Sequence, residues 1–402
     1  MATMGGTEMT KSSGWPLTRR QAIVGGVAAS VATMVGGRGP AFAAAAPDTI
    51  RIYGVSTMAL KDWSVFTEAT GLKVEFNPTG AEPGAYMREI SANQIGDNID
   101  IFIFVGNTPS VLGPGGFYAD LGDKLPGLEI WKSIPDTLKT GPNNVADGKT
   151  YGVPVINNAD SFGFWAEDLG ITNPTEKQSW ELMFESEKTK GKVALENYSV
   201  SSLTHFAAWV KLKGLGKIED PADLEPEEAK LVADYAISRK KAGQFKTFFT
   251  TFDEQVDLLQ RKEVLALNCW EPCVKEINKN LGKEAVYYAY AEYHYKWGDS
   301  AYVSPAALEA GRWDIIAKAL SFFMGEGGAY RALQARDRGY GGPHMELAEK
   351  YAKENNWEAA DIAAVAAVSK KIDRKYALPF FGKTVPKNAA VMEEQWQRFV
   401  AA

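Results

Sequence analysis

The chain has 402 residues, of which 45% are hydrophobic and 23% charged, and its formal net charge is −6. This length is enough for two domains that share the burial of a core. A net negative charge without a basic block argues against binding to nucleic acid or to an anionic membrane surface. We therefore expect an ordinary soluble protein with neither of these partners.

The N-terminus carries the features of an export signal. The paired arginines Arg19 and Arg20 precede a short Gly- and Ala-rich apolar run over residues 22–37, and small residues follow up to Ala43. The run is too short to span a bilayer, and its order of charged, apolar and cleavable regions is that of a secretory signal. The arginine pair indicates the twin-arginine route. We expect residues 1–43 to be removed near Ala43 and the mature protein to be periplasmic.

From residue 49 onward the hydrophobic pattern alternates between strands and helices. Strands are predicted over residues 50–55, 72–76 and 99–105, with a helix between each pair. This order describes a βαβαβ unit and an α/β fold. In such sheets ligands bind beyond the carboxyl ends of the strands. The candidate ligand-binding residues after the first and third strands are Tyr53, Ser56, Asn107 and Thr108.

Later segments add candidates of the same kind. Residues 148–160, which include Asn158, predict a crossing into a second lobe. Asn197 and Ser199 stand between a predicted strand and a helix, where such residues either cap the helix or place backbone donors before an anion. A short strand over residues 264–267 is followed by Trp270 and Glu271, an aromatic ring beside a carboxylate.

The segment from Val286 to Ser300 contains five tyrosines, Trp297, Glu292 and Asp299. An aromatic face attracts an ammonium group by about 0.5–2 kcal/mol, and a nearby carboxylate neutralises a charge whose burial would otherwise be costly. We assign the tyrosines mainly to a strand, expect the backbone to turn at Gly298, and place a cation cage at Trp297 and Asp299.

The two cysteines, Cys269 and Cys273, are four residues apart. In an oxidising compartment they could form a local disulfide, but the geometric limits for so short a separation are strict, and the sequence leaves this open. None of the three histidines has a metal-ligand spacing with the cysteines. We expect neither a metal nor a cofactor.

Six ordered segments resemble the extracellular solute-binding proteins of ABC importers, most closely the polyamine-binding group, over essentially the whole mature chain. They are Thr70-Gly71-Leu72-Lys73-Val74, Ile99-Asp100-Ile101, Tyr151-Gly152-Val153-Pro154, Ser179-Trp180-Glu181-Leu182, Gly191-Lys192-Val193-Ala194 and Trp297-Gly298-Asp299. The resemblance implies a two-lobed, type II-like periplasmic binding protein with mixed sheets flanked by helices and a ligand cleft between the lobes. It further implies a non-enzymatic monomer that serves an inner-membrane permease.

The resemblance also implies domain bounds and site roles. Lobe 1 would comprise residues 44–153 and about 296–343, and lobe 2 residues 154–295 and about 344–402. Trp297 and Trp270 would place rings against the ligand, Asp299 would pair with an ammonium group, and Tyr53, Asn107 and Thr108 would face the cleft.

The chain departs from the polyamine group where that group has acidic residues in its second lobe, because Asn197 and Val200 stand there. An unpaired buried ammonium group is costly. We therefore expect a small cationic or zwitterionic amine in place of spermidine, with Asp299 and Glu271 as the acidic partners.

Other functions remain open. Adjacent tyrosines at positions 287 and 288 resemble the tyrosinate ligands of related ferric-ion-binding proteins, although neighbouring strand residues point to opposite faces. A periplasmic hydrolase is the less favoured alternative, since the chain has no nucleophile-elbow or HExxH motif. A binding protein that serves a membrane sensor would have the same sequence features as one that serves an importer.

Overall fold

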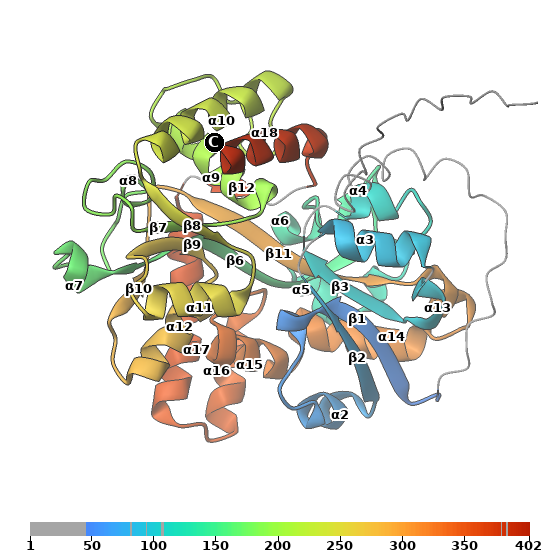
Figure 1. The fold of residues 1–402 in the computed structure, drawn as a ribbon. Coiled ribbons are helices and arrows are strands. Elements are labelled where there is room, and N and C mark those ends of the chain that lie inside the picture. Colours follow the sequence, from blue (N-terminus) through green and yellow to red (C-terminus); the bar gives the residue numbers. More distant parts are fainter. Residues whose placement is uncertain (1–45, 81–82, 94, 106–107, 379, 383–384) are drawn as a thin grey trace, which may run out of the picture. The chain divides into compact units, whose positions relative to one another are not determined.

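The computed structural model describes residues 46–80, 83–93, 95–105, 108–378, 380–382 and 385–402 of the chain (Figure 1). The predicted export signal and Asn107 lie outside these residues. Within them, no helix has the length and apolar character needed to cross a membrane.

Ten strands of the described chain form one mixed sheet in the order β2-β1-β3-β11-β6-β9-β7-β8, with β10 beside β6 and β12 beside β11. These strands are β1 Thr49–Val55, β2 Lys73–Thr79, β3 Ile101–Val105, β6 Gly152–Trp165, β7 Val193–Glu196, β8 Phe245–Phe249, β9 Ala266–Cys269, β10 Val286–Tyr288, β11 His294–Val303 and β12 Phe380–Gly382. A separate small hairpin consists of β4 Val145–Ala146 and β5 Lys149–Thr150.

Helices flank the sheet. The longer ones are α2 Ser64–Thr70, α3 Pro83–Ala92, α9 Ser199–Leu212, α10 Pro226–Lys241, α11 Phe252–Gln260, α12 Glu271–Leu281, α14 Trp313–Met324, α15 Ala329–Arg338, α16 Met345–Glu354, α17 Ala359–Tyr376 and α18 Ala389–Ala401. The short ones are α4 Pro109–Leu112, α5 Glu129–Ser133, α6 Asp136–Lys139, α7 Ala166–Leu169, α8 Glu181–Phe184, α13 Pro305–Glu309 and the 3-10 turns η2 Ser56–Met58, η3 Ile95–Asn98 and η4 Leu125–Gly127.

The predicted βαβαβ unit is confirmed at the start of the fold. β1 pairs in parallel with both β2 and β3, so the order in the sheet is β2-β1-β3. Helix α2 ends at Gly71, whose φ of 74° is the left-handed conformation that glycine adopts without a steric penalty. The α/β fold class inferred from the alternating pattern is therefore correct.

Two long strands, β6 and β11, pair antiparallel and connect two hydrophobic cores (Figure 1). The first core is built from residues 50–156 and 301–340, and the second from residues 162–293 and 392–399. β6 contributes Val153 to the first core and Phe164 to the second, so it belongs to both.

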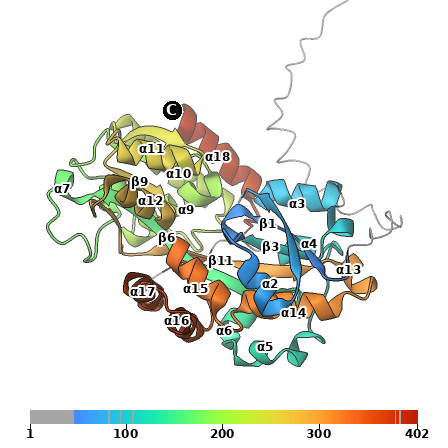
Figure 2. The same cartoon turned by 90° about the horizontal axis from the view of Figure 1, so that it is seen from below.

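A third, smaller cluster joins α15, α16 and α17, which lie side by side in Figure 2. Because α16 and α17 pack with α15 in a cluster of their own, the core clusters do not by themselves assign the chain after residue 343. The lobe bounds inferred from the sequence stay a prediction.

The tyrosine-rich segment is two strands and not one. β10 ends at Tyr288 and β11 begins at His294. The predicted turn at Gly298 is wrong, because this residue lies inside β11. A Cβ at this position would lie 3.1 Å from the carbonyl oxygen of Ile156 on β6. Glycine here permits close strand pairing and does not redirect the chain.

Candidate ligand-binding site

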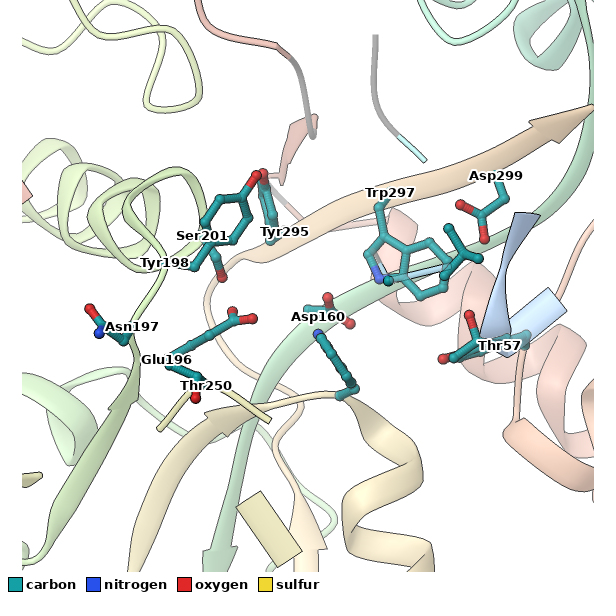
Figure 3. A pocket seen from close by; sticks show the side chains of 14 residues that line it. Thr57, Asp160, Glu196, Asn197, Tyr198, Ser201, Thr250, Tyr295, Trp297 and Asp299 are labelled. Carbon is teal, nitrogen blue, oxygen red and sulfur yellow. The ribbon is translucent and has the colours of Figure 1, made fainter. Parts of the chain in front are cut away.

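A pocket of about 390 Å³ lies where the ends of several strands meet (Figure 3). Val55 ends β1, Gly80 follows β2, Glu196 ends β7, Thr250 follows β8 and Trp270 follows β9. The carboxyl ends of these strands therefore supply one side chain or loop each, as expected for a ligand site in an α/β sheet. The connecting strands β6 and β11 add further lining residues.

Three carboxylates line this pocket. Asp160 lies on β6, Glu196 at the end of β7 and Asp299 on β11. In the view of Figure 3, Asp160 lies between the other two. Asp160 is the register partner of Tyr295. Because side chains on a strand alternate with a period of two, Tyr295, Trp297 and Asp299 share the face of β11 that meets Asp160.

Aromatic rings form much of the remaining surface. The lining rings are Tyr198, Trp270, Tyr295, Trp297 and Tyr340. The Trp297 and Tyr340 rings meet edge to face, with centroids 5.1 Å apart and an interplanar angle of 89°. Trp270 is stacked on Phe252, which lies outside the lining, with centroids 6.3 Å apart. These contacts hold the two tryptophans in fixed orientations.

Two of the lining residues have a buried polar atom without a partner. Among the described residues, neither the Tyr295 hydroxyl nor the Trp297 indole nitrogen has a hydrogen-bond partner. Buried polar groups in folded proteins are nearly always hydrogen-bonded. Both atoms are also closed off from solvent, so in this structure they lie beneath the pocket surface.

The electrostatic character of the pocket is negative. Among the described residues that line it, none is lysine, arginine or histidine. Burial raises the pKa of Tyr295 well above its ordinary value, and the charges of Asp160 and Glu196 raise it further. Burial likewise raises the pKa of Tyr340, with an added effect of Asp160 and Asp299. A cation entering this space would meet carboxylates and electron-rich rings.

Hydrogen bonds from outside the pocket position its edges. The Trp396 indole nitrogen on α18 donates to Oδ1 of Asn197 at 2.9 Å. The backbone nitrogen of Glu196 donates to Oδ1 of Asn268 at 2.9 Å. Asn143 donates through Nδ2 to the Gly298 carbonyl oxygen at 3.0 Å. The loop after β7 and the middle of β11 are thus tied to neighbouring elements.

The structure brings together only some of the residues predicted from the sequence. Those that line the pocket are Asn197, Trp270, Trp297 and Asp299. Those described elsewhere are Tyr53, Ser56, Thr108, Asn158, Ser199 and Glu271. The ligand roles proposed for this second group thus have no support from the pocket geometry.

Each of these six residues has another environment. Tyr53 packs edge-on against Phe104, and Oγ1 of buried Thr108 accepts a hydrogen bond from the Tyr118 hydroxyl at 3.4 Å. Ser56 is exposed on η2, and Ser199 is buried at the first residue of α9. Asn158 and Glu271 bind lysines of α17: Lys375 lies 3.4 Å from Oδ1 of Asn158, and Lys371 lies 2.7 Å from Oε1 of Glu271.

Sequence reasoning missed two of the three carboxylates. Glu196 directly precedes Asn197 at the carboxyl end of a predicted strand, so its position was a usable signal. Asp160 lies within a long strand and has no motif around it. Only the pairing of β6 with β11, which sets Asp160 opposite Tyr295, shows that it faces the pocket.

The adjacent tyrosines considered as iron ligands point to opposite faces, as expected for a strand. The Tyr287 ring packs near Phe164, whereas the Tyr288 hydroxyl accepts from the Ser161 backbone nitrogen at 2.8 Å and donates to the Cys269 carbonyl at 2.9 Å. Burial raises the pKa of Tyr288 well above its ordinary value, which disfavours a tyrosinate. Among the described residues, no group of three or more His, Cys, Asp or Glu side chains is arranged to hold a metal.

The two cysteines are both buried free thiols in this structure. Cys269 ends β9 and Cys273 lies in the first turn of α12. They flank Trp270 and Glu271 but lie outside the pocket lining.

Comparison with known proteins gives a consistent result. The family model for bacterial extracellular solute-binding proteins matches residues 64–375. The spermidine/putrescine ABC transporter substrate-binding protein PotD from Streptococcus pneumoniae has a similar structure, with a TM-score of 0.64 and 14% identity over 88% of this chain and 99% of that one. A search of curated proteins found no match.

Two further solved structures share the fold. An ABC transporter substrate-binding protein from Bradyrhizobium japonicum has a TM-score of 0.61 and 16% identity over 87% of this chain and 99% of that one. AgtB from Agrobacterium tumefaciens, in complex with agropinic acid, has a TM-score of 0.56 and 14% identity over 88% of this chain and 99% of that one. At such identities the likeness shows the fold alone.

Proposed function

Because the chain belongs to the family of bacterial extracellular solute-binding proteins, we propose that it captures a small amine with two or more positive charges for an ABC importer. One observation carries this proposal: three carboxylates and five aromatic rings line a pocket whose described lining has no cationic side chain. The family consists of binding proteins, so the chain binds its solute and does not convert it.

The chemistry of the lining favours a linear polyamine-like ligand. Each ammonium group that leaves water needs a carboxylate partner, since an uncompensated buried charge is costly. The methylene segments between ammonium groups need apolar surface, and the ring faces supply it along with cation–π attraction. Glu196 follows Leu195 of the second core and Asp299 precedes Ala301 of the first. The two carboxylates could therefore bind two separated ammonium groups.

The sequence indicated a smaller cation or a zwitterion because it showed no acidic residue at the second-lobe positions. Glu196 and Asp160 supply that acidity from neighbouring positions. A zwitterion would bring its own carboxylate into this negative field. We therefore favour a multiply charged amine over a zwitterion.

The ligands of similar proteins are of more than one kind. PotD is described as a spermidine/putrescine-binding protein, whereas AgtB was crystallised with agropinic acid. The same fold thus holds ligands of different charge. The acidic lining is what favours the amine for this chain.

The proposal includes hinge closure and export. β6 and β11 run from one core to the other and would bend as the ligand draws the two sides together. A membrane permease would recognise the closed form. A membrane sensor, in place of a permease, remains the alternative partner.

We also propose that residues 1–43 direct export by the twin-arginine route to the periplasm. Mass spectrometry of the mature N-terminus checks the cleavage near Ala43.

Isothermal titration calorimetry of the mature protein tests the ligand class. The panel is putrescine, spermidine, a monoamine, 4-aminobutyrate and a neutral sugar. We expect binding of the di- and triamine, with a matching rise in melting temperature, and much weaker binding of the others. Tight binding of the amino acid or the sugar, with none of the polyamines, would overturn the proposal.

A further inference from the structure

Lys371 on α17 connects two walls of the pocket from outside its lining. Its ammonium group lies 2.7 Å and 2.8 Å from the two carboxylate oxygens of Glu271 and donates to the Gly339 carbonyl oxygen at 2.7 Å. Glu271 directly follows Trp270, whose ring lines the pocket. On the other side, Gly339 directly precedes the lining residue Tyr340. Each contact of Lys371 is therefore made one residue away from a lining ring.

The two walls belong to different parts of the fold. Tyr340 is a member of the first core. Trp270 stands between Cys269 and Cys273, which are both members of the second core. Helix α17 thus links the two cores at the edge of the pocket through the side chain of Lys371.

On the Tyr340 side, the chain leaves α15 through a glycine that leaves room for the ammonium group. Gly339 has a φ of 72°, in the left-handed region that favours glycine. A Cβ at this position would lie 3.1 Å from the ammonium nitrogen of Lys371 and 2.7 Å from that of Lys275. The carbonyl group that Lys371 binds belongs to the peptide unit between Gly339 and Tyr340. The contact therefore fixes the direction in which the backbone enters Tyr340.

The rest of this segment, residues 341–343, is held at two further points. The Gly341 backbone exchanges two hydrogen bonds with the backbone of Asn157 on β6, at 2.9 Å and 3.1 Å. The fully buried Arg331 donates from Nε to the Pro343 carbonyl oxygen at 2.9 Å. The segment is therefore fixed at both ends, and Lys371 joins its start to the opposite wall.

On the Trp270 side, the lining residue is continuous with the start of α12. The Trp270 carbonyl oxygen accepts a hydrogen bond from the Cys273 backbone nitrogen at 2.9 Å. Glu271 is the first residue of the helix, where the helix dipole favours a carboxylate. A second lysine, Lys375, lies 3.2 Å from Oε2 of Glu271. The carboxylate therefore keeps a cationic partner when Lys371 is replaced.

We propose that Lys371 is a positioning residue that holds the Trp270 and Tyr340 rings at the spacing that the ligand requires. It acts through Glu271 and Gly339 and does not itself touch the ligand. A site whose groups are already in place binds more tightly, because less ordering is needed when the ligand enters. The inference deepens the proposed function and rests on it, since it takes the occupant of the pocket to be a small amine.

Calorimetry with putrescine compares the mature wild type with Lys371→Met. We expect the affinity to fall about fivefold or more, because the two walls lose the side chain that joins them. Attraction through space predicts the opposite sign, since the loss of a nearby positive charge should strengthen the binding of a cation. An unchanged or increased affinity therefore overturns the inference.

Lys370→Met is the matched control, because it removes the same charge from the neighbouring, exposed position of α17. Its affinity should stay within about twofold of the wild type. An equal fall in the two variants would contradict a role that is particular to Lys371. If Lys371→Met does not melt cooperatively, Lys371→Gln, whose polar side chain is shorter, takes its place with the same expected loss.

Hydrogen exchange of the ligand-free protein distinguishes failure of this inference from failure of the proposed function. In Lys371→Met, the backbone amides of Tyr340 and Gly341 should exchange about tenfold faster, while those of α10 stay unchanged. A wild type that binds no amine contradicts the proposed function, and the exchange rates still test the role of Lys371. A wild type that binds putrescine, with unchanged exchange in the variant, contradicts only the role of Lys371.

Discussion

The indole nitrogen of Trp396 and the side-chain oxygen of Asn197 form a hydrogen bond of 2.9 Å that ties the C-terminal helix to the edge of the ligand pocket. Trp396 is fully buried and its ring packs against Phe248 and Phe399. The bond therefore joins a core residue to a residue of the lining, and the last helix of the chain helps to position the site.

Replacing Trp396 with Phe should weaken ligand binding through this bond alone. The substitution keeps an aromatic ring in the core but removes the donor, at a cost of about 1 kcal/mol, or roughly fivefold in affinity. Trp180→Phe is the control, because it removes an indole bond of 3.0 Å to the Tyr293 carbonyl in the same core but away from the lining. Both variants should lose stability, and only Trp396→Phe should lose affinity. Equal affinities in calorimetry would contradict the positioning role.

The carboxylates Asp299 and Glu196 should each bind a cationic group of the ligand. Asp299→Asn or Glu196→Gln should weaken diamine binding more than about tenfold, since a hydrogen bond to a charged group contributes about 1.5–3 kcal/mol. Glu187→Gln serves as control, because this exposed residue pairs only with Lys190 among the contacts described for it. Calorimetry at two salt concentrations separates direct pairing from long-range attraction. An unchanged affinity in both pocket variants would contradict the pairing of these two carboxylates with the ligand.

The Trp297 ring should contribute through its face and apolar area. Trp297→Leu keeps apolar bulk but removes the cation–π attraction, which is worth about 0.5–2 kcal/mol. We expect diamine affinity to fall roughly tenfold while a neutral ligand of similar length is unaffected. Leu in place of Trp131, a partly buried residue outside the lining, is the control. Ligand-induced quenching of tryptophan fluorescence should also decrease in the Trp297 variant.

Asp100 should be essential for stability and irrelevant to ligand choice. Its fully buried carboxylate lies 2.7 Å from Nε of Arg312 and accepts from the Arg51 backbone nitrogen at 2.8 Å. Asp100→Asn removes the buried carboxylate that pairs with Arg312, so we expect a loss of about 3 kcal/mol or more in the free energy of unfolding. Denaturant titration measures this loss. A change in the ratio of putrescine to spermidine affinity would instead place Asp100 in the recognition of ligand.

Acid should destabilise the protein through Glu271. Burial alone would raise its pKa, but the charges of Lys375, Lys371 and Lys275 outweigh this and hold the pKa at about 2, below the ordinary 4.5. A folded-state pKa below the unfolded value contributes stability that is present above pH 4.5 and is lost as the pH falls through about 2. This contribution is about 3 kcal/mol.

The measurement is the melting temperature of the wild type and of Glu271→Gln at pH values from 2 to 5. The variant is expected to be less stable at neutral pH, because two lysines lose their partner, and to show a shallower decline on acidification. If the melting temperatures of the two proteins fell in parallel with pH, Glu271 would not be the cause of the loss of stability in acid.

Much of the scaffold was predictable from local patterns. The sequence shows the apolar runs of β1 and β3 and the glycine that ends α2, because these features depend only on residues that are neighbours in the sequence. Trp297 and Asp299 were also placed together, because they are two residues apart in the sequence, although the turn predicted between them is a continuous strand. These features need no knowledge of long-range packing.

The remaining features depend on pairings between distant segments. Glu271 follows a strand and beside Trp270 resembled a ligand-binding acid, yet α17 reaches it with two lysines from a hundred positions later in the chain. Asp160 faces the pocket only because β11 pairs with β6 in a particular register. Side-chain direction in such cases follows from tertiary contacts that a single sequence does not display.

The late position of β11 in the sequence also has a consequence for the order in which the chain acquires structure during synthesis. Most of the second core lies within residues 162–293, so it can form before β11 has been made. β3, with the apolar sequence Ile-Phe-Ile-Phe-Val, must wait for β11 to cover one edge. An uncovered apolar strand edge is a template for aggregation. Until β11 has emerged from the ribosome, β3 is the segment that we expect a chaperone to shield.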